Sequence, residues 1–472
     1  MTGEATATTT GRRPPWAWPL ALLLVAAAAA PLVLYWLGNV DDQRLVDLDV
    51  YRTGGQALLE GRPVYDFVTP APQLLPFTYP PVAAMLAVPL AMMSWPVAQW
   101  VWTAGIFAAL AVTVAYAFHA ALGRFAQGRI APGRFASGRA ASGRVASGPG
   151  VPGGGEPDDA ASGRVAPGRG VPGRTAAPAE GRRGGLWLPA VFAVLMVACT
   201  YLMPIRDQIR FGQVDILLVA LCLADCAARR PIWPRGLLIG LATAVKLTPG
   251  VFLIYLLLTG FGPGGRPEQR RAFFMAAFTA ALLTLLPFLV IPSDAAGFWF
   301  HALLDPERLG ANAATTNQSM RGMLIRLYLP DAPTSLLWLA LVAAVGWHGF
   351  RHARRAFLDG HATTGVALTG LMAVLLSPVA WIHHLAWVVV VLGALAGDGR
   401  DPVRVRVAAG VWLYYVVPVP WWGVTIKAAE IPVLSPVLGK IVQNGFGLGA
   451  LVLVWLLASW LPRRRETFRS LA

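Results

Sequence analysis

An acidic motif near the N-terminus is the first candidate for chemistry. Asp47 and Asp49 form a D-x-D pattern, which binds a divalent metal in some enzymes. Leu45, Leu48 and Tyr51 recur beside them at helical spacing, which predicts a short amphipathic helix on a membrane surface. Residues two apart on a helix point in different directions, so the two carboxylates are not expected to chelate one ion. Either one of them serves a membrane-bound substrate, or both belong to a solvated face.

A single lysine interrupts a long apolar run in the middle of the chain. Lys246 stands in the sequence L-A-T-A-V-K-L-T-P, and Pro249 follows three residues later. A lysine at the centre of a membrane helix costs about 2.5–3.5 kcal/mol on insertion scales, so we expect it to pair with another group or face a wet cavity. Pro249 is expected to break the helix just after it, in contact with protein or water. Snorkelling at a helix end is the simpler alternative.

Two adjacent histidines form a third candidate. His383 and His384 stand between Trp381 and Trp387 in the sequence S-P-V-A-W-I-H-H-L-A-W. An interfacial aromatic belt with incidental polar residues is the simpler interpretation. A histidine pair without further ligands is weak evidence for a metal. It is better evidence for hydrogen bonds to a polar or anionic group.

Two more polar stretches supply cations and amides. Arg206, Arg210 and Gln213 belong to the first, at 206–215, and Asn317, Gln318 and Arg321 belong to the second, at 315–322. Asn317 also begins an N-x-S match, a short pattern that is expected often by chance. Arg321 lies in a stretch that we expect to face outward, against the usual charge bias of membrane proteins. An outward cation of this kind favours a bound anion.

The elements that must position these residues are membrane helices. Hydrophobic residues make up 56% of the 472-residue chain, charged residues only 13%, and the mean hydropathy is +0.56. A soluble domain carries about 25% charged residues. Apolar segments recur at 16–37, 80–94, 96–121, 186–204, 213–228, 236–260, 272–292, 335–350, 363–380, 384–397, 406–420 and 443–461. Since a crossing needs about 20 residues, we expect an all-α polytopic membrane protein with about twelve transmembrane helices.

The distribution of arginine predicts the topology. Arginines cluster at 351–355, 400–406 and 463–465, and the positive-inside rule assigns these clusters and both termini to the cytosol. The stretches 39–78, 293–334, 381–384 and 421–441 then face outward. The same rule explains the net charge of +15, so we expect no nucleic-acid partner. The predicted location is the cytoplasmic membrane, with a retained first helix and no cleaved signal.

Residues 123–185 form a separate insert. A Gly-Arg pair recurs there every five residues from Arg124 to Arg144, and prolines are frequent. This composition predicts a disordered and dispensable segment. Its arginines favour the cytosol, whereas a helical hairpin over 80–121 would place it outside, and its side is left open. The predicted organisation is a tail at 1–15, first helices at 16–122 with the outer loop 39–78, the insert at 123–185, a helix bundle at 186–462 and a tail at 463–472.

The order of the motifs carries a family resemblance. The chain reads D-L-D-V-Y from Asp47, then G-R-P-V-Y, F-T-Y-P-P, G-Q-V-D, K-L-T-P, N-Q-S and finally S-P-V-A-W-I-H-H. Each motif is short, and their joint order is the specific signal. This order resembles glycosyltransferase family 87, polyprenol-phosphate-dependent mannosyltransferases of actinobacteria with a GT-C-type fold. The resemblance covers the chain from about Asp47 to Trp387, apart from the insert.

The resemblance implies an inverting transferase whose active site faces outward. Asp47 would be the general base, and His383 and His384 would also be catalytic. The implied substrate-binding residues are Asp49, Tyr51, Tyr79, Arg206, Arg210, Gln213, Lys246, Asn317, Gln318 and Arg321. The implied partners are a polyprenyl-phosphate sugar donor, a glycolipid or lipoglycan acceptor and membrane lipids, with no cofactor or metal. The chain has no Gly-rich phosphate loop, which independently disfavours a nucleotide-sugar donor.

Two other classes of protein compete with this interpretation. A transporter or lipid flippase would also have a dozen helices and a lysine at membrane depth. It has no need of a base beside a surface helix, however, and the chain shows none of the internal duplication common in transporters. A membrane scaffold protein is the third class, and no motif supports it.

Overall fold

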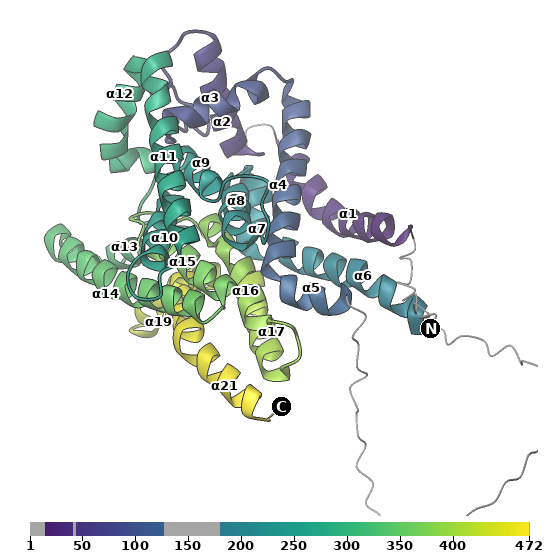
Figure 1. Ribbon diagram of the computed structural model, residues 1–472. Coiled ribbons are helices and arrows are strands. Elements are labelled where there is room, and N and C mark those ends of the chain that lie inside the picture. The colour runs from purple at the N-terminus through teal and green to yellow at the C-terminus, as the bar shows by residue number, and fades with distance from the viewer. Residues whose placement is uncertain (1–14, 41–43, 127–179, 472) are drawn as a thin grey trace, which may run out of the picture.

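A computed structural model describes residues 15–40, 44–126 and 180–471. These residues form helices and connecting loops, and the only strand pairing among them is two isolated bridges, Val68 with Pro76 and Asn317 with Trp381. The all-α prediction is therefore confirmed for the described chain. Figure 1 shows the helices gathered into one bundle, with α1 and α6 side by side at its edge.

The helices follow the apolar segments closely. In the first half they are α1 (Ala17–Leu37), α2 (Val46–Leu59), α3 (Pro81–Ala91), α4 (Trp95–Ala117), α5 (His119–Ala126), α6 (Glu180–Thr200), α7 (Met203–Phe211), α8 (Asp215–Ala227) and α9 (Leu237–Val245). Next come α10 (Val251–Gly260), α11 (Pro267–Val290), α12 (Pro292–Phe300), α13 (Met320–Ile325), α14 (Asp331–Leu358) and α15 (Ala362–Leu375). The last are α16 (Val388–Ala396), α17 (Pro402–Val416), α18 (Val419–Ala428), α19 (Leu434–Gln443), α20 (Gly445–Trp455) and α21 (Leu461–Leu471).

The described helices do not confirm the expected count of about twelve crossings. Within the described residues, five helices are long and apolar enough to cross a membrane, or up to seven if each of two bent pairs counts as one span. Several predicted segments are short helices, such as α3 with 11 residues, α8 with 13 and α15 with 14. At 1.5 Å per residue these fall short of a bilayer of about 30 Å. The apolar segments of the sequence therefore correspond to short helices as well as to long ones.

The four stretches predicted to face outward lie together in the structure. The Val64 amide donates to Asp294 Oδ1 at 2.7 Å, and this bond joins the loop 39–78 to the stretch 293–334. The bridge between Asn317 and Trp381 joins that stretch to the histidine region. Gln318 Nε2 donates to the Gln443 carbonyl at 3.0 Å, which adds α19, the helix that begins within 421–441. Figure 1 shows α2, α3 and α12 gathered at the top of the molecule.

The arginine clusters also lie together. Arg464 pairs with Asp401 at 2.7 Å, and Arg465 donates to Thr364 Oγ1 at 2.9 Å. These contacts bring the clusters at 400–406 and 463–465 to the start of α15, directly after α14. Helices α17 and α21 lie at the bottom of Figure 1, away from α2. The arginine clusters thus lie at one end of the molecule and the acidic loop 39–78 at the other.

The insert leaves the bundle at the arginine end. A Cβ on Gly393 would collide with the Ala117 carbonyl oxygen, so the end of α4 touches α16, the helix that leads to the 400–406 cluster. Residues 127–179 lie outside the described residues, so the predicted disorder is not tested. The ends of the predicted insert, 123–126 and 180–185, belong instead to helices α5 and α6. This placement favours the side that the arginines indicated.

The predicted amphipathic helix is α2, and close contacts fix its position. Leu48 and Tyr51 of this helix, and Leu45 just before it, are buried inside the protein, whereas the sequence predicted an apolar face on the membrane surface. A Cβ on Gly55 would lie 2.8 Å from the Ala87 carbonyl oxygen, so glycine allows α2 to pack tightly on α3. The Leu45 amide donates to the Arg210 carbonyl at 3.1 Å, which docks the start of α2 on the end of α7. The first turn of α2 is thereby held beside the G-Q-V-D turn.

Deleting the insert tests whether the fold depends on it. Helices α5 and α6 contact each other, so a short Gly-Ser linker between Gln127 and Ala179 reconnects neighbouring elements. We expect deletion of residues 128–178 to leave the melting temperature in detergent within a few degrees of wild type, because a Gly-Arg repeat contributes no apolar core. Thermal unfolding and size-exclusion chromatography measure this. Aggregation of the deletion variant would show that the segment supports the fold.

Candidate active site

The centre of the site is an ion pair between Lys246 and Asp215. Helix α9 ends at Val245, Lys246 is extended, and a 3₁₀ turn follows at Thr248–Gly250, so the predicted break is confirmed. The Lys246 ammonium donates to Asp215 Oδ1 at 2.8 Å. The two side chains are only 14% and 9% exposed. The lysine therefore pairs with a buried acid, as an ammonium in an apolar environment must, and does not snorkel.

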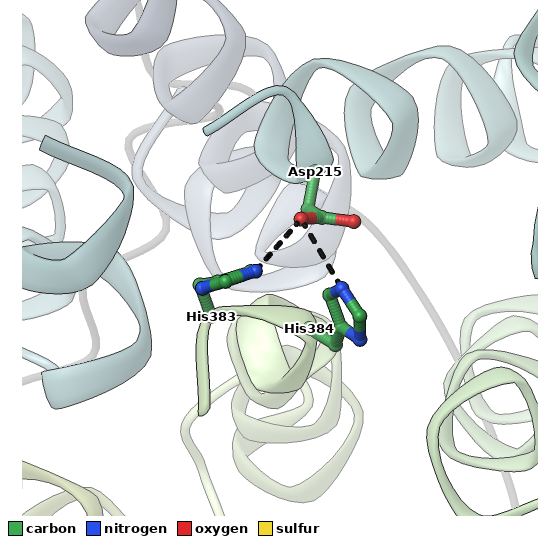
Figure 2. A group of neighbouring side chains, drawn as sticks. All are labelled: Asp215, His383 and His384. Carbon is green, nitrogen blue, oxygen red and sulfur yellow. Dashed lines mark ion pairs between the residues drawn. The ribbon is translucent and has the colours of Figure 1, made fainter. Parts of the chain in front are cut away.

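The histidine pair lies against the same carboxylate. His383 and His384 belong to the 3₁₀ turn η5 (Ile382–Trp387). Their Nε2 atoms lie 3.7 and 3.8 Å from Asp215 Oδ2, and Figure 2 shows both rings facing that oxygen. His384 Nε2 also lies 3.0 Å from the Lys246 ammonium. Asp215 Oδ2 and His383 Nε2 are both buried and have no hydrogen-bond partner.

A glutamine holds these elements in register. Gln208 Nε2 on α7 donates to the His383 carbonyl at 2.8 Å. Its Oε1 accepts from the Ile216 amide at 3.4 Å, at the start of α8. Gln208 is fully buried, so these bonds form where water does not compete. One side chain thereby fixes the turn of the histidines relative to the helix that carries Asp215.

A hydrogen-bonded network connects the ion pair to α2. The hydroxyls of Tyr51 and Tyr79 lie 2.9 Å apart, and they donate to Gln213 Oε1 at 3.1 and 3.3 Å. The amide of Gln213 in turn hydrogen-bonds the Asp47 carboxylate. On the other side, the Lys246 ammonium lies over the Tyr79 ring, 5.4 Å from its centre. Gln213, Tyr51, Tyr79 and Lys246, four of the predicted site residues, thus belong to one network with Asp47.

The environment of Asp47 alters its acidity. The residue as a whole is partly exposed, but protein surrounds its carboxyl group. Burial raises the pKa of Asp47 from 3.8 to about 7, although the hydrogen bond from Gln213 and the charge of Lys246 oppose the rise. A carboxylate with a pKa near neutrality is suited to accept a proton at physiological pH. Asp47 therefore has the acidity that a general base needs.

Asp49 lies in different surroundings. Burial raises its pKa too, and the nearby charge that opposes the rise is that of Arg52. The Arg52 side chain donates to the Met93 carbonyl at 3.0 Å, so this pair faces α3 and the loop after it. Among the residues that the structure describes, Asp47 is thus paired with Gln213 and Asp49 lies near Arg52. This agrees with the expectation that the D-x-D acids point apart.

The amides of the N-Q-S motif form a structural network. Asn317 Oδ1 accepts from the Ser319 and Ala380 amides at 3.2 and 3.0 Å. Gln318 Nε2 donates to the Thr315 and Gln443 carbonyls at 2.6 and 3.0 Å. Both residues are fully buried with their polar atoms paired. These bonds hold the extended segment before His383 in place.

The predicted arginines are placed less uniformly. Arg210 lies over the rings of Trp36 and Phe211, 4.8 Å from each centre. Arg206 lies one turn away on α7, where both arginines act electrostatically on Asp207. Arg321 lies over the Trp338 ring on α14, 5.7 Å from its centre. Within the described chain, no recorded contact joins Arg321 to Lys246 or the histidines.

Asp215 is the residue that the sequence analysis quoted but did not select. It follows the G-Q-V turn and begins an apolar helix, where an acid also benefits from the helix dipole. The signal for it was Lys246, because a lysine in an apolar run requires a partner. The choice among the acids of the chain needed the tertiary structure, since Asp215 lies 31 residues away in sequence.

Comparison with known proteins decides the family. The sequence profile of glycosyltransferase family 87 matches residues 77–146 and 169–378, more than half of the chain. The chain belongs to glycosyltransferase family 87. It is therefore an enzyme that transfers a sugar, and the transporter and scaffold alternatives are set aside.

Curated relatives agree with the family assignment. A polyprenol-phosphate-mannose-dependent alpha-(1-2)-phosphatidylinositol mannoside mannosyltransferase of Mycolicibacterium smegmatis is 34% identical over 396 residues, which cover 81% of this chain and 76% of the relative. The protein of the same description from Mycobacterium tuberculosis is 33% identical over 423 residues, covering 87% and 83%. A pentamannoside mannosyltransferase of Mycobacterium tuberculosis is 28% identical over 408 residues, covering 85% and 78%. No solved structure matches the chain.

The family 87 match differs in extent from the expected one. It begins at residue 77 and ends at residue 378, so it includes Lys246 and Asp215 but neither Asp47 nor the histidine pair. It also enters both ends of the segment 123–185, which the sequence analysis had excluded from the family. Asp47 and His384 lie outside the matched range, and it is the contacts around Lys246 that connect them to the matched residues.

Proposed function

We propose that this family 87 enzyme transfers a mannosyl residue from a polyprenyl-phosphate donor to a phosphatidylinositol mannoside type of glycolipid. The names of the 34% and 33% identical relatives support this donor and this acceptor. The geometric observation that carries the proposal is the connection of Asp47 to Lys246. A carboxylate with a pKa of about 7 and a buried ammonium act on each other through Gln213 and Tyr79. The Asp47 carboxylate takes the proton of the acceptor hydroxyl, and the Lys246 ammonium faces the phosphate of the donor.

Asp47 and Lys246 suffice for each bond and proton change of the transfer reaction. The acceptor hydroxyl oxygen attacks the anomeric carbon from the face opposite the phosphate and forms the new glycosidic bond. The bond between that carbon and the phosphate oxygen breaks, and its electron pair stays on the phosphate. The hydroxyl proton goes to the Asp47 carboxylate. Attack from the opposite face inverts the configuration at the anomeric carbon.

Lys246 faces the charge that develops on the leaving group. The donor phosphodiester carries one negative charge, and the released polyprenyl monophosphate carries a second one until it is protonated. A fixed cation in a site shielded from water stabilises such a developing charge strongly. The buried Lys246 ammonium meets this requirement, and the histidines lie beside it. Arg206 and Arg210 lie on the adjacent helix α7, and a contact of either with the lipid phosphate belongs to the proposal.

The proposed site opens at the outer face of the cytoplasmic membrane. Asp47 lies in the first turn of α2, within the loop that the charge rule places outside. The arginine clusters and the attachment of the insert lie at the other end of the molecule. A lipid-linked donor and a glycolipid acceptor both present their head groups at a membrane surface, where α2 lies. Asp66 is an exposed residue of the same loop. Cysteine labelling of Asp66→Cys from outside intact cells tests this placement, and labelling only after lysis would contradict it.

The direct test uses purified enzyme in lipid nanodiscs. Polyprenyl-phosphate-[¹⁴C]mannose and phosphatidylinositol mannosides are incubated with wild type and with Asp47→Ala. We expect radiolabelled glycolipid from wild type and almost none from the variant. The variant that lacks residues 128–178 should retain transfer activity, because none of the residues proposed here belongs to that segment. Wild-type enzyme that is inactive with this donor but active with a nucleotide sugar would refute the proposed donor.

The pH dependence of the wild type follows from the pKa of Asp47. Only the deprotonated carboxylate accepts a proton, so kcat/KM should rise about tenfold per pH unit below pH 7. It should level off above the pKa of about 7. Initial rates at saturating acceptor and low donor concentration measure this profile. A rate that stays flat from about pH 5 to pH 8 would exclude a base with this pKa.

A further inference from the structure

Asp215, His383 and His384 together form a cradle of metal-ligand type. One ligand atom from each of the three side chains lies within 4.8 Å of the others. One carboxylate and two neutral imidazoles are a common ligand set for Zn²⁺ and related divalent ions. Two of the ligand atoms, Asp215 Oδ2 and His383 Nε2, are buried without a hydrogen-bond partner. Figure 2 shows these groups turned toward one another.

The cationic position in this cradle is already taken by a side chain. The Lys246 ammonium lies 2.8 Å from Asp215 Oδ1 and 3.0 Å from His384 Nε2. Lys246 is itself the extended residue between α9 and the turn at Thr248–Gly250, and this backbone position anchors its side chain. Two of the three ligand residues thus already donate their lone pairs to a cation. A divalent ion bound there would meet the positive charge of Lys246 at close range.

We infer that Lys246 is a tethered substitute for a divalent metal ion, and that removing its ammonium converts Asp215, His383 and His384 into a metal-binding site. The inference rests on the proposed function only for the role of the cation, which is to face the donor phosphate. The metal-binding part depends on the cradle alone. In this arrangement Asp215 is a positioning residue, since it acts on the donor only through Lys246.

The wild type and Lys246→Ala are expected to differ in metal binding. In the wild type the ammonium fills the cradle, so transfer should be insensitive to EDTA and purified protein should contain no stoichiometric metal. In Lys246→Ala the ammonium and its stem are absent, and a small inward movement brings three ligands within about 2.0–2.2 Å of an ion. Water or the donor phosphate would complete its coordination. The ion would then face the phosphate in place of the lysine.

Co²⁺ is the probe for the variant site, because its visible absorption bands report tetrahedral coordination. We expect Lys246→Ala to bind about one Co²⁺ per chain with these bands, and the wild type to show none. His383→Ala in the Lys246→Ala background should weaken Co²⁺ binding by at least about 10-fold. Lys246→Met is the matched control, since its long apolar side chain fills the space without a charge. Adding Co²⁺ to Lys246→Met should therefore produce none of the absorption bands of tetrahedral Co²⁺.

Transfer assays of the same proteins complete the experiment. Added Zn²⁺ or Mn²⁺ should restore part of the activity of Lys246→Ala and none of that of Lys246→Met. Stoichiometric metal in wild type, measured by elemental analysis and removed by EDTA with loss of activity, would overturn the inference. So would the absence of Co²⁺ binding in a monodisperse Lys246→Ala protein. Co²⁺ binding to Lys246→Ala when no wild-type transfer is seen would uphold the cradle and reject only the proposed function.

Discussion

Replacing Asp47 with asparagine is expected to lower kcat by about 10²–10⁴, the usual contribution of acid–base catalysis. Asparagine keeps the size of the side chain and its hydrogen bond with Gln213, but it cannot take the acceptor proton. The Tyr51 and Tyr79 bonds to Gln213 do not involve Asp47, so α2 should remain in place. Steady-state transfer from polyprenyl-phosphate-mannose measures the loss. The residual rate should no longer rise with pH near 7.

Asp49→Asn is the matched control in the same turn. Its carboxylate faces Arg52, away from Gln213, so we expect a rate close to that of the wild type. Donor binding, measured separately with labelled lipid, should be unchanged in both variants. Severe and equal losses at both positions, rescued by Mn²⁺ or Mg²⁺, would instead restore the metal-binding interpretation of the D-x-D pattern. Full activity of Asp47→Asn would leave the enzyme without its base.

Replacing Lys246 with methionine is expected to lower kcat by about 10–1,000-fold, the range of a single electrostatic group at a developing charge. Donor affinity should also fall, because the ammonium faces the phosphate in both ground and transition states. The variant leaves Asp215 buried without its partner, and removing one member of a buried ion pair costs about 3–5 kcal/mol of stability. Activity must therefore be compared with folding. Thermal unfolding of each variant supplies that comparison.

A double variant separates the two effects. Lys246→Met combined with Asp215→Asn removes both charges, so stability should return toward that of wild type while transfer stays low. Lys440→Ala is the control for loss of a lysine, since its ammonium lies over the Tyr328 ring, 4.8 Å from its centre. Arg321→Ala, which the sequence analysis grouped with Lys246, should have the smaller effect because it stacks on Trp338. Near-normal transfer by Lys246→Met would mean that the lysine only balances Asp215.

Much of the architecture was predictable because it depends on local sequence. The apolar segments became helices, the amphipathic spacing after residue 44 became α2, and the chain breaks between Lys246 and Pro249. Helical periodicity and the geometry of proline act within a few residues, so a single sequence reveals them. The joint order of short motifs also sufficed to recognise family 87, although none of the motifs explains by itself what it contacts.

The sequence by itself determined that Lys246 needs a partner, but only the tertiary structure decided which one. Asp215 is 31 residues away, His384 is 138 residues away, and Tyr51 meets Gln213 across 162 residues. Such pairs depend on how helices pack, and no local pattern encodes that. The tertiary structure also showed that several apolar segments form short helices and that Asn317 and Gln318 are buried and paired with neighbouring groups. Residue type determined which chemistry was available here, and long-range packing determined which of these residues lie together.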